Sequence, residues 1–337
     1  MKRILVTGGA GFIGSNFVRM VLSEHPDCFV VNLDKLTYAG NLENLSEFLE
    51  HPSYKFVKGD ICNGKLVEKI IDEYQIDAIV NFAAESHVDR SITEPKIFIE
   101  TNIAGTLTLL EAARDKNLER FIQISTDEVY GALGPEGKFT EQRRLSPNSP
   151  YSASKAAADH LVKAFGHTWG VKYNITRCSN NYGEYQFPEK MIPLMINNAL
   201  NDKELPVYGD GLYVRDWLYV YDHCAAIWQV LQKSPSGEIY NIGGCNEKTN
   251  LEVIDVILSR LGKPKSLIKH VTDRPGHDRR YAIDASKIIS KLDWRPSVSF
   301  EEGINKTIDW YLLNQQWLNN IVSGDYQKYY ESMYGNR

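Results

Sequence analysis

The sequence predicts an α/β protein with a doubly wound parallel sheet and a smaller C-terminal lobe that is interleaved with it. Short apolar runs at 4–6, 29–33 and 78–82 are typical of parallel strands that are buried on both faces. Segments with apolar residues at helical spacing separate these strands. The 337 residues are enough for one large core and a second, smaller lobe.

The first strand runs into a glycine-rich turn, and apolar residues recur at helical spacing from Phe12 onward. Glycine allows a tight turn and a close approach by a pyrophosphate, whose charge is attracted by the free amides of the helix N-terminus. The spacing G-x-x-G-x-x-G also occurs in plain turns, so strand, loop and helix together carry the prediction of a dinucleotide site. Its expected contacts in this turn are Gly8, Gly11, Phe12, Ile13 and Gly14.

The second strand ends in Asp34, twenty residues after Gly14. A carboxylate at this place can accept hydrogen bonds from both hydroxyls of the adenosine ribose, and it repels a 2′-phosphate. The sequence therefore favours NAD over NADP, although Lys35 beside Asp34 could still attract that phosphate. Thr37 is a further candidate for cofactor contact.

The next two strands end in further candidate cofactor contacts. The third strand, 54–57, is followed by Asp60 and Ile61, which could flank the adenine or, alternatively, cap the next helix. The fourth strand, 78–82, runs into Ala83, Ala84 and Ser86, whose small side chains suit a close approach by the cofactor.

The segment between the fourth and fifth strands begins with two titratable residues, His87 and Asp89. Neither is assigned to catalysis, because a loop histidine bonded to backbone is the commoner case. A helix is predicted over 95–116, with one apolar face packed on the sheet. That face consists of Ile99, Ile103, Leu107 and Leu110.

The fifth strand, 120–124, brings Thr126, Asp127 and Glu128 to the same edge of the sheet as the glycine loop. Two adjacent acids at this place suggest acid–base chemistry. The irregular stretch 132–149 after them is longer than most connections, so it is a candidate flap over the site.

Ser149 and Pro150 resemble the start of a helix that carries Tyr151 and Lys155. Four residues apart, these two side chains leave one face of the helix about a turn from each other. A phenol normally ionises near pH 10, and lowering that pKa to about 7 takes ~4 kcal/mol. A lysine ammonium and a nicotinamide cation could supply this stabilisation, so Tyr151 and Lys155 are predicted to be catalytic and to contact the cofactor.

Composition excludes several other classes of protein. The net charge of −5 comes from mixed acids and bases, so no nucleic-acid partner is expected. There is no apolar run long enough for a membrane span and no signal-peptide core, so we expect a cytoplasmic protein. Five scattered cysteines without C-x-x-C spacing predict neither a metal site nor disulfides, but reduced and mostly buried thiols.

The glycine loop and the Tyr151/Lys155 pair together resemble the extended short-chain dehydrogenase/reductase family, whose fold is a Rossmann-type sheet. Over essentially the whole chain, the sequence is similar to the dTDP-glucose 4,6-dehydratases of that family. The segments 126–131, 180–183, 185–190 and 274–278 carry this closer resemblance. There are two departures: Glu184 replaces a usual proline, and Tyr221 replaces an acid that often precedes Asp222 and His223. Both are expected to alter the fit of the substrate without removing a catalytic group.

The resemblance implies an NAD-binding domain at 1–178, with later returns near 219–245, and a mainly sugar-nucleotide-binding domain at 179–337. Diphosphates favour arginine, and an aromatic ring suits a pyrimidine face. A C-terminal helix at 301–318 and the Tyr-rich tail after it are expected to serve packing only. The implied substrate contacts are Ser86, Thr126, Asn181, Lys190, Pro206, Tyr208, Arg215, Asn250, Arg274 and His277.

The implied activity is the dehydration of dTDP-glucose to a 4-keto-6-deoxy sugar in a homodimer, with tightly bound NAD that is recycled. Tyr151 would take the carbon 4 hydroxyl proton while Thr126 holds that oxygen. Asp127 would be the general acid and Glu128 the general base. Two alternatives stay open, a nucleotide-sugar 4-epimerase and a non-catalytic dinucleotide sensor. The residues do not separate thymine from uracil as the base.

Overall fold

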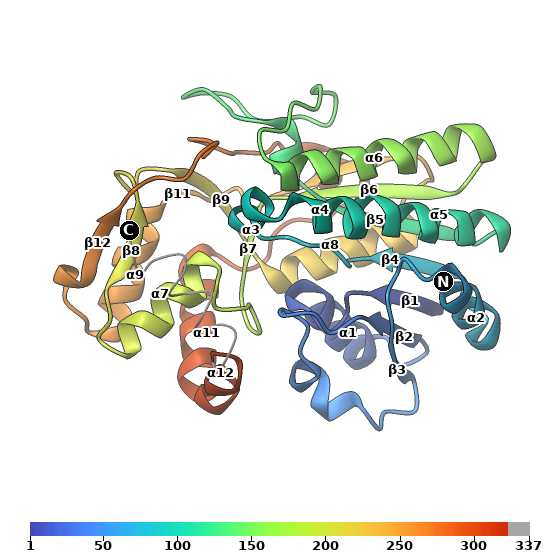
Figure 1. The fold of residues 1–337 in the computed structure, drawn as a ribbon, viewed down its shortest axis with the longest axis horizontal. Helices are drawn as coiled ribbons and strands as arrows, with labels where there is room; N and C mark the ends of the chain where they lie inside the picture. Colours follow the sequence, from blue (N-terminus) through green and yellow to red (C-terminus); the bar gives the residue numbers. More distant parts are fainter. Residues whose placement is uncertain (323–337) are drawn as a thin grey trace.

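A single parallel sheet forms the body of the molecule in this computed structural model, which describes residues 1–322 (Figure 1). Within that range the sheet has seven strands in the order β3-β2-β1-β4-β5-β6-β10, and each neighbouring pair is parallel. The predicted doubly wound α/β fold is therefore confirmed. The strands are β1 (Arg3–Thr7), β2 (Phe29–Asp34), β3 (Tyr54–Lys58), β4 (Ala78–Asn81), β5 (Arg120–Thr126), β6 (Tyr173–Cys178) and β10 (Ile239–Ile242).

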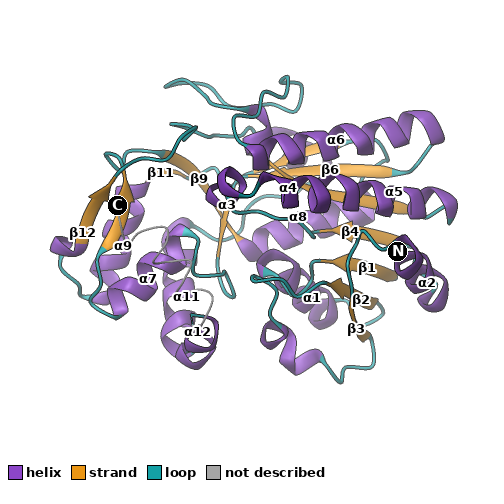
Figure 2. Ribbon diagram, in the orientation of Figure 1, coloured by secondary structure: helices purple, strands orange, loops and turns teal. Residues whose placement is uncertain are grey.

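Helices cover both faces of the sheet because successive strand side chains point in opposite directions (Figure 2). Ile4 and Val6 of β1 belong to the apolar core that α1, α8 and α10 cover, whereas Leu5 between them belongs to the core that α2, α5 and α6 cover on the other face. All three side chains are fully buried. These helices are α1 (Phe12–Glu24), α2 (Gly64–Tyr74), α5 (Thr106–Asp115), α6 (Pro150–Trp169), α8 (Val220–Lys233) and α10 (Ser286–Leu292).

A second lobe with its own apolar core lies beyond the carboxyl ends of the large sheet's strands (Figure 1). It contains the small sheets β11-β9-β7 and β12-β8. The chain leaves this lobe after β9 to add β10 to the large sheet, and then returns with β11. Its elements are β7 (Asn180–Tyr182), α7 (Met191–Leu200), β8 (Leu205–Tyr208), β9 (Val214–Tyr219), β11 (Glu247–Thr249), α9 (Asn250–Leu261), η4 (Lys265–Leu267), β12 (Ile268–Val271), α11 (Phe300–Leu313) and α12 (Gln315–Ile321).

The predicted helix at 95–116 is continuous but changes its winding. It consists of α4 (Pro95–Phe98), a π-helical segment η2 (Ile99–Gly105) and α5. The predicted apolar face is confirmed only in part: Leu110 is buried and Leu107 packs against the core of the sheet, whereas Ile99 is 50% exposed. Asn102 is buried instead, and its side-chain amide bonds both backbone groups of Glu85 and the hydroxyl of Ser154.

Two other predicted segments also differ. The C-terminal helix is two helices, α11 and α12, because the chain breaks at Asn314, and the Tyr-rich tail lies outside the described residues. The stretch 132–149 is irregular as expected, but it lines neither of the cavities described below. Its buried Phe139 is bonded through its backbone to Ala282 and Asp284, so this part of the stretch is held against the segment that follows β12.

Candidate active site

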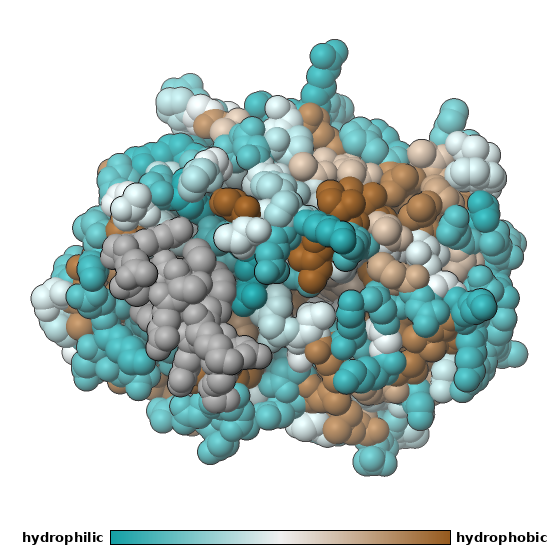
Figure 3. All heavy atoms as spheres, viewed as in Figure 1, coloured by the Kyte–Doolittle hydropathy of each residue, from teal (hydrophilic) through white to brown (hydrophobic). Residues whose placement is uncertain are grey.

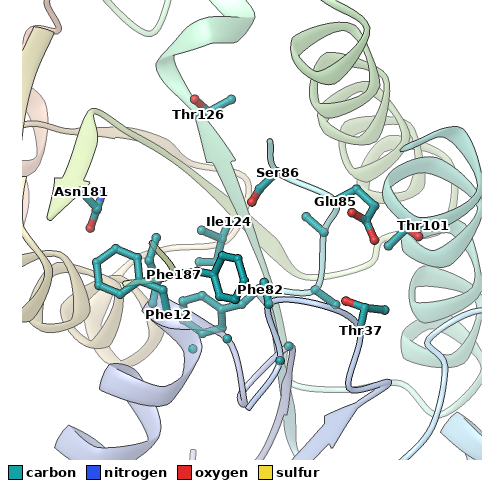
Figure 4. A pocket seen from close by; sticks show the side chains of 18 of the residues that line it. Phe12, Thr37, Phe82, Glu85, Ser86, Thr101, Ile124, Thr126, Asn181 and Phe187 are labelled. Atoms are coloured by element: carbon teal, nitrogen blue, oxygen red, sulfur yellow. The ribbon is translucent and has the colours of Figure 1, made fainter. Parts of the chain in front are cut away.

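A large cavity lies at the carboxyl ends of the strands, where the strand order reverses between β1 and β4 (Figure 4). This is the usual ligand position in an open α/β sheet. We call it the glycine-loop cavity, and the structure gathers every predicted cofactor contact around it. These residues are Gly8, Gly11, Phe12, Ile13, Gly14, Asp34, Lys35, Thr37, Asp60, Ile61, Ala83, Ala84, Ser86, Tyr151 and Lys155.

The glycine loop has the form needed to receive a pyrophosphate. Gly8 has a φ of +68°, and a Cβ there would lie 2.7 Å from the backbone of Ala83. A Cβ on Gly14 would lie 2.3 Å from the carbonyl oxygen of Gly8, so only glycine lets the helix start this close to the loop. Helix α1 begins without a side-chain cap and without an acid in its first turn. Its N-terminal amides are therefore free to bind an anion, such as the pyrophosphate of a dinucleotide.

Asp34 is fixed by two backbone amides at the end of β2. Its Oδ2 accepts a 2.9 Å hydrogen bond from Ala10, and its Oδ1 accepts a 2.8 Å bond from Leu36. Burial raises the pKa of Asp34, and these two hydrogen bonds oppose the shift. Lys35, which could have attracted a 2′-phosphate, instead forms a 2.7 Å ion pair with Asp60. The arrangement fits a ribose with two free hydroxyls, which is the ribose of NAD.

Helix α6 presents Tyr151 and Lys155 to the same cavity. Ser149 and Ser152 form a reciprocal capping box at its N-terminus, as the sequence predicted for Ser149. Lys155 is buried and donates a 2.6 Å hydrogen bond to the carbonyl oxygen of Ile124 on β5. Burial lowers the pKa of Lys155 to about 8.

The pKa of Tyr151 differs from the sequence expectation. Burial raises it well above the usual value, Glu128 adds to the shift, and a hydrogen bond from Thr126 opposes it. The ammonium group of Lys155 donates its hydrogen bond to the carbonyl oxygen of Ile124. Ionisation of the phenol at neutral pH therefore needs a further positive charge at the cavity, such as the cationic ring of an oxidised nicotinamide.

The acid pair stands on η3 (Asp127–Tyr130), a single 3₁₀ turn capped by Thr126 directly after β5. Asp127 is 1% exposed, and its Oδ1 lies 3.3 Å from the hydroxyl of Thr126. Burial and the neighbouring Glu128 raise the pKa of Asp127 well above the ordinary value. Burial also raises the pKa of Glu128, but Arg274 and Arg215 oppose that shift. The two carboxyls thus occupy different electrostatic environments.

A second cavity, which we call the Tyr208 cavity, lies in the C-terminal lobe. It shares Glu128, Asn180, Glu189 and Lys190 with the glycine-loop cavity, so the two cavities meet at these residues. Lys190 donates a 2.8 Å hydrogen bond to the carbonyl oxygen of Ser86, which joins the two lobes at this junction. The predicted substrate contacts that line the Tyr208 cavity are Lys190, Pro206, Tyr208, Arg215, Asn250, Arg274 and His277.

The remaining predicted substrate contacts, Ser86, Thr126 and Asn181, line the glycine-loop cavity (Figure 4). Asn181 is oriented by its neighbours: its amide donates to the carbonyl oxygen of Ser179, and its Oδ1 lies 2.9 Å from Nδ1 of His223. His223 is completely buried, which lowers its pKa to about 3. The neutral ring therefore donates from Nδ1 to Asn181, an orientation that the sequence did not predict.

Sequence reasoning missed other residues of the site. Asn180 and Glu189 line both cavities, and the only hint was that each lies next to a predicted contact. Glu189 is buried and accepts a 3.0 Å hydrogen bond from Arg90. His87 and Asp89, to which the sequence assigns no catalytic role, both line the Tyr208 cavity. Burial lowers the pKa of His87 to about 4, so its ring is neutral at pH 7.

The two departures from the family pattern do not touch the substrate region, contrary to expectation. Glu184 lines neither cavity, and it accepts a 2.6 Å hydrogen bond from the hydroxyl of Tyr219. Its carbonyl oxygen accepts a bond from Asn16 of α1. Tyr221 also lies outside both cavities and donates from its hydroxyl to Glu24 of α1. Both residues connect α1 to its surroundings.

Comparison with known proteins agrees with this site. A family model described as GDP-mannose 4,6 dehydratase matches residues 5–307. A dTDP-glucose 4,6-dehydratase from Xanthomonas campestris pv. campestris (strain B100) is 56% identical over 345 residues, covering 97% of this chain and 98% of the relative. dTDP-glucose 4,6-dehydratase 1 of Escherichia coli (strain K12) is 51% identical, over 99% of both chains. The chain belongs to the dTDP-glucose 4,6-dehydratase family.

Solved structures from this family, and one from a UDP-glucose 4-epimerase, have the same fold. A dTDP-glucose 4,6-dehydratase of Bacillus anthracis str. Ames, in complex with NAD, is 53% identical with a TM-score of 0.90, covering 95% of this chain and 100% of that one. A Streptomyces venezuelae member with bound NAD is 49% identical with a TM-score of 0.92, covering 95% and 99%. A UDP-glucose 4-epimerase of Thermus thermophilus, in complex with NAD, is 32% identical with a TM-score of 0.85, covering 92% and 99%.

The described part of the chain offers neither a metal centre nor a membrane span. Among residues 1–322, no cluster of three or more His, Cys, Asp or Glu side chains could hold a metal ion. No helix in the same range is both long and apolar enough to span a membrane. All five cysteines are free thiols; Cys28, Cys178 and Cys224 are buried, and Cys62 and Cys245 are exposed.

Proposed function

We propose that this protein dehydrates dTDP-glucose to dTDP-4-keto-6-deoxyglucose, a precursor of deoxysugars, with a tightly bound NAD that is recycled in each turnover. The observation that carries the proposal is the position of the buried acid pair. Asp127 and Glu128 line the glycine-loop cavity together with Tyr151, and Glu128 also lines the Tyr208 cavity. A sugar held where the two cavities meet would therefore lie between an oxidation site and two carboxyls.

The residues that line the two cavities divide the binding task. The glycine loop and the amides of α1 would hold the pyrophosphate of NAD, and Asp34 its adenosine ribose. Tyr208 offers an aromatic face to the pyrimidine of the substrate. Arg215, Arg274 and Lys190 supply positive charge for its diphosphate. When bound, NAD would accept hydride from carbon 4 and, after water is lost, return it to carbon 6 while a proton returns to carbon 5, so the dinucleotide is recycled.

The chemical steps are proton transfers by this chain's own side chains. Tyr151, as phenolate, takes the proton of the carbon 4 hydroxyl during oxidation of that carbon, while Thr126 holds the oxygen. The resulting ketone acidifies the hydrogen on carbon 5, which Glu128 removes as general base. Asp127 protonates the carbon 6 hydroxyl, which then leaves as water. The surroundings of the two carboxyls support these roles, because the charge of Glu128 adds to burial in raising the pKa of Asp127, whereas the charges of Arg274 and Arg215 oppose the rise at Glu128.

A 4-epimerase is the nearest alternative, and the likeness to the Thermus enzyme keeps it worth testing. Epimerisation needs the Tyr151/Lys155 chemistry but has no use for two carboxyls. The mass of the product after incubation with dTDP-glucose separates the two activities. Loss of one water supports the dehydratase, and an unchanged mass supports the epimerase.

The same incubation tests the role of NAD. Purified protein should turn over without added NAD if the dinucleotide stays bound, and a stoichiometric need for NAD would contradict recycling. A non-catalytic dinucleotide sensor would show no change in absorbance at 340 nm with any nucleotide sugar. Transient reduction of nicotinamide on mixing with dTDP-glucose would exclude the sensor.

We also propose that the protein acts as a homodimer in the cytoplasm. Apolar side chains gather on the face where Figure 1 places α4 and α5 (Figure 3). On α3 (Val88–Thr93), α4 and η2, Ile92 is 40% exposed, Ile97 36% and Ile99 50%, as in surfaces that a partner covers. A sedimentation experiment should show twice the 38.4 kDa mass of one chain, and Ile99→Glu should favour the monomer. A monomeric wild-type protein would contradict the proposal.

A further inference from the structure

Asp89 occupies an unusual place in the Tyr208 cavity. It lies in the first turn of α3, on the side of the cavity that belongs to the NAD-binding part of the chain, and it is 5% exposed. Its Oδ2 accepts a 3.0 Å hydrogen bond from the hydroxyl of Tyr208, and its Oδ1 accepts a 2.9 Å bond from Nη1 of Arg274. One buried carboxylate thus holds two side chains that come from different segments of the second lobe.

The carboxylate is ionised in this position. Burial raises the pKa of Asp89, but the charge of Arg274, together with the hydrogen bonds from Arg274 and Tyr208, holds it below the usual value. Removing the charge would leave Arg274 partly buried without its ion-pair partner. Breaking this buried ion pair should therefore cost more free energy than breaking an exposed salt bridge.

Both side chains held by Asp89 face the nucleotide in the proposed function. Tyr208 ends β8, and Arg274 follows β12, the strand that pairs with β8. The guanidinium of Arg274 lies 6.0 Å from the centre of the Tyr208 ring, and the ring of His277 meets the Tyr208 ring edge to face. A bond at the hydroxyl limits rotation and tilt of the Tyr208 ring, and the bond at Nη1 fixes the plane of the guanidinium.

We propose that Asp89 is a positioning residue for nucleotide binding, which orients the Tyr208 ring and the Arg274 guanidinium toward a nucleoside diphosphate. The inference rests on the proposed function, because it takes the Tyr208 cavity as the nucleotide site. It goes beyond that function because it says what orients Tyr208 and Arg274: an acid on the other side of the Tyr208 cavity. This acid, Asp89, lies in the same segment as Ser86, which lines the glycine-loop cavity. A purely structural role would instead make Asp89 a tie between the lobes.

The test measures the Kd of dTDP by calorimetry and KM and kcat for dTDP-glucose, in protein that retains its NAD. Asp89→Ala should raise the Kd of dTDP and KM at least tenfold, with kcat within about threefold and NAD content unchanged. Asp89→Asn keeps an oxygen for Tyr208 but loses the charge opposite Arg274, so its effect should be intermediate. Tyr208→Phe keeps the ring and removes only the hydroxyl, and it should weaken dTDP binding several-fold.

Asp210→Asn provides a matched control. Asp210 forms a bidentate ion pair with Arg279, a few residues after Arg274, but it lies outside the Tyr208 cavity. This variant weakens the ion pair that holds the segment carrying Arg274 and His277 to the rest of the lobe. It should leave the Kd of dTDP unchanged. If Asp89→Asn and Asp210→Asn weaken binding equally, Asp89 only ties the segment down and the proposal is overturned.

Two further outcomes separate a failure of the positioning role from a failure of the proposed function. If wild-type protein binds dTDP and both Asp89→Asn and Tyr208→Phe bind it equally well, the positioning role is wrong while the proposed function stands. If wild-type protein binds neither dTDP nor dTDP-glucose, the proposed function itself fails, and the inference fails with it. Because Tyr208→Phe changes only one hydroxyl, the test stays decisive even if Asp89→Ala does not fold.

Discussion

The ammonium nitrogen of Lys155 lies 2.6 Å from the carbonyl oxygen of Ile124, to which it donates a hydrogen bond. The bond joins helix α6 to strand β5 one helical turn after Tyr151, and it places a positive charge between the two elements that carry the proposed catalytic groups. Burying this charge is costly, so the pKa of Lys155 falls from 10.5 to about 8.

The buried lysine should affect stability in a specific pH range. Between pH 8 and 10.5 the unfolded chain keeps this proton while the native protein loses it, so this group makes the native state more stable as pH rises. Lys155→Met lacks the effect. Its free energy of unfolding relative to wild type should therefore fall by up to about 3 kcal/mol across this range. Urea unfolding of NAD-free protein measures it, with Lys163→Met on the exposed side of α6 as the control. Parallel curves for Lys155→Met and wild type would contradict the low pKa.

The acid pair should divide the dehydration. Asp127→Asn and Glu128→Gln should each reduce the rate by about 10²- to 10⁴-fold, as expected for loss of a general acid or base. Glu128→Gln should also stop exchange of the carbon 5 hydrogen with deuterated water, whereas Asp127→Asn should allow exchange and block loss of water. Mass spectrometry follows both, and Glu136→Gln, at an exposed acid of the nearby loop, is the control. Near wild-type rates in both variants would show that the pair has another role.

Asp34 should govern retention of the dinucleotide. Asp34→Ala removes the acceptor for the ribose hydroxyls and releases the amides of Ala10 and Leu36. A hydrogen bond to a charged group contributes about 1.5–3 kcal/mol, so NAD should bind about 10- to 100-fold more weakly. Calorimetric titration of the stripped protein with NAD measures the loss. Asp72→Asn breaks an ion pair between the exposed Asp72 and Lys116, away from the cavity, so it should leave NAD binding unchanged. Equal losses in both variants would argue against the ribose contact.

The Arg177–Asp159 ion pair should contribute to stability rather than to chemistry. Their side chains are 2% and 0% exposed, and the pair is 2.9 Å long and lines neither cavity. Arg177→Met leaves a buried carboxylate without its partner and should cost about 3–5 kcal/mol, whereas Arg177→Met with Asp159→Leu should cost much less. Urea unfolding measures both variants. A double variant as unstable as the single one would show that the charge on Asp159 is not what the arginine compensates.

The base of the nucleotide should be selected only moderately. A thymine methyl group is worth about 1–3 kcal/mol in a fitted pocket, so dTDP-glucose should exceed UDP-glucose by about 10- to 200-fold in kcat/KM. The series is completed by CDP- and GDP-glucose under the same conditions. Equal rates with all four substrates would overturn the assignment of dTDP-glucose.

Local patterns in the sequence determined the parts of the protein that depend on local physics. Short apolar runs specified the strands of the large sheet, since a parallel strand that is buried on both faces can be identified from its own residues alone. The glycines specified the turn because only glycine fits at positions 8 and 14, where a Cβ would lie 2.7 Å and 2.3 Å from backbone atoms. The four-residue spacing of Tyr151 and Lys155 placed both on one helix face.

Only the tertiary structure decided how distant segments meet. Asp89 contacts Tyr208 and Arg274 across 119 and 185 residues, and no periodicity in the chain encodes such a contact. The spacing of apolar residues likewise did not predict the π-helical segment in which Asn102 is buried and Ile99 is exposed. That spacing carries no information on the three hydrogen bonds that the Asn102 side chain makes with Glu85 and Ser154. Glu184 and Tyr221 likewise form hydrogen bonds with α1, a contact that the sequence did not predict. Each segment's sequence thus limits what that segment can form, and packing determines which polar groups become partners.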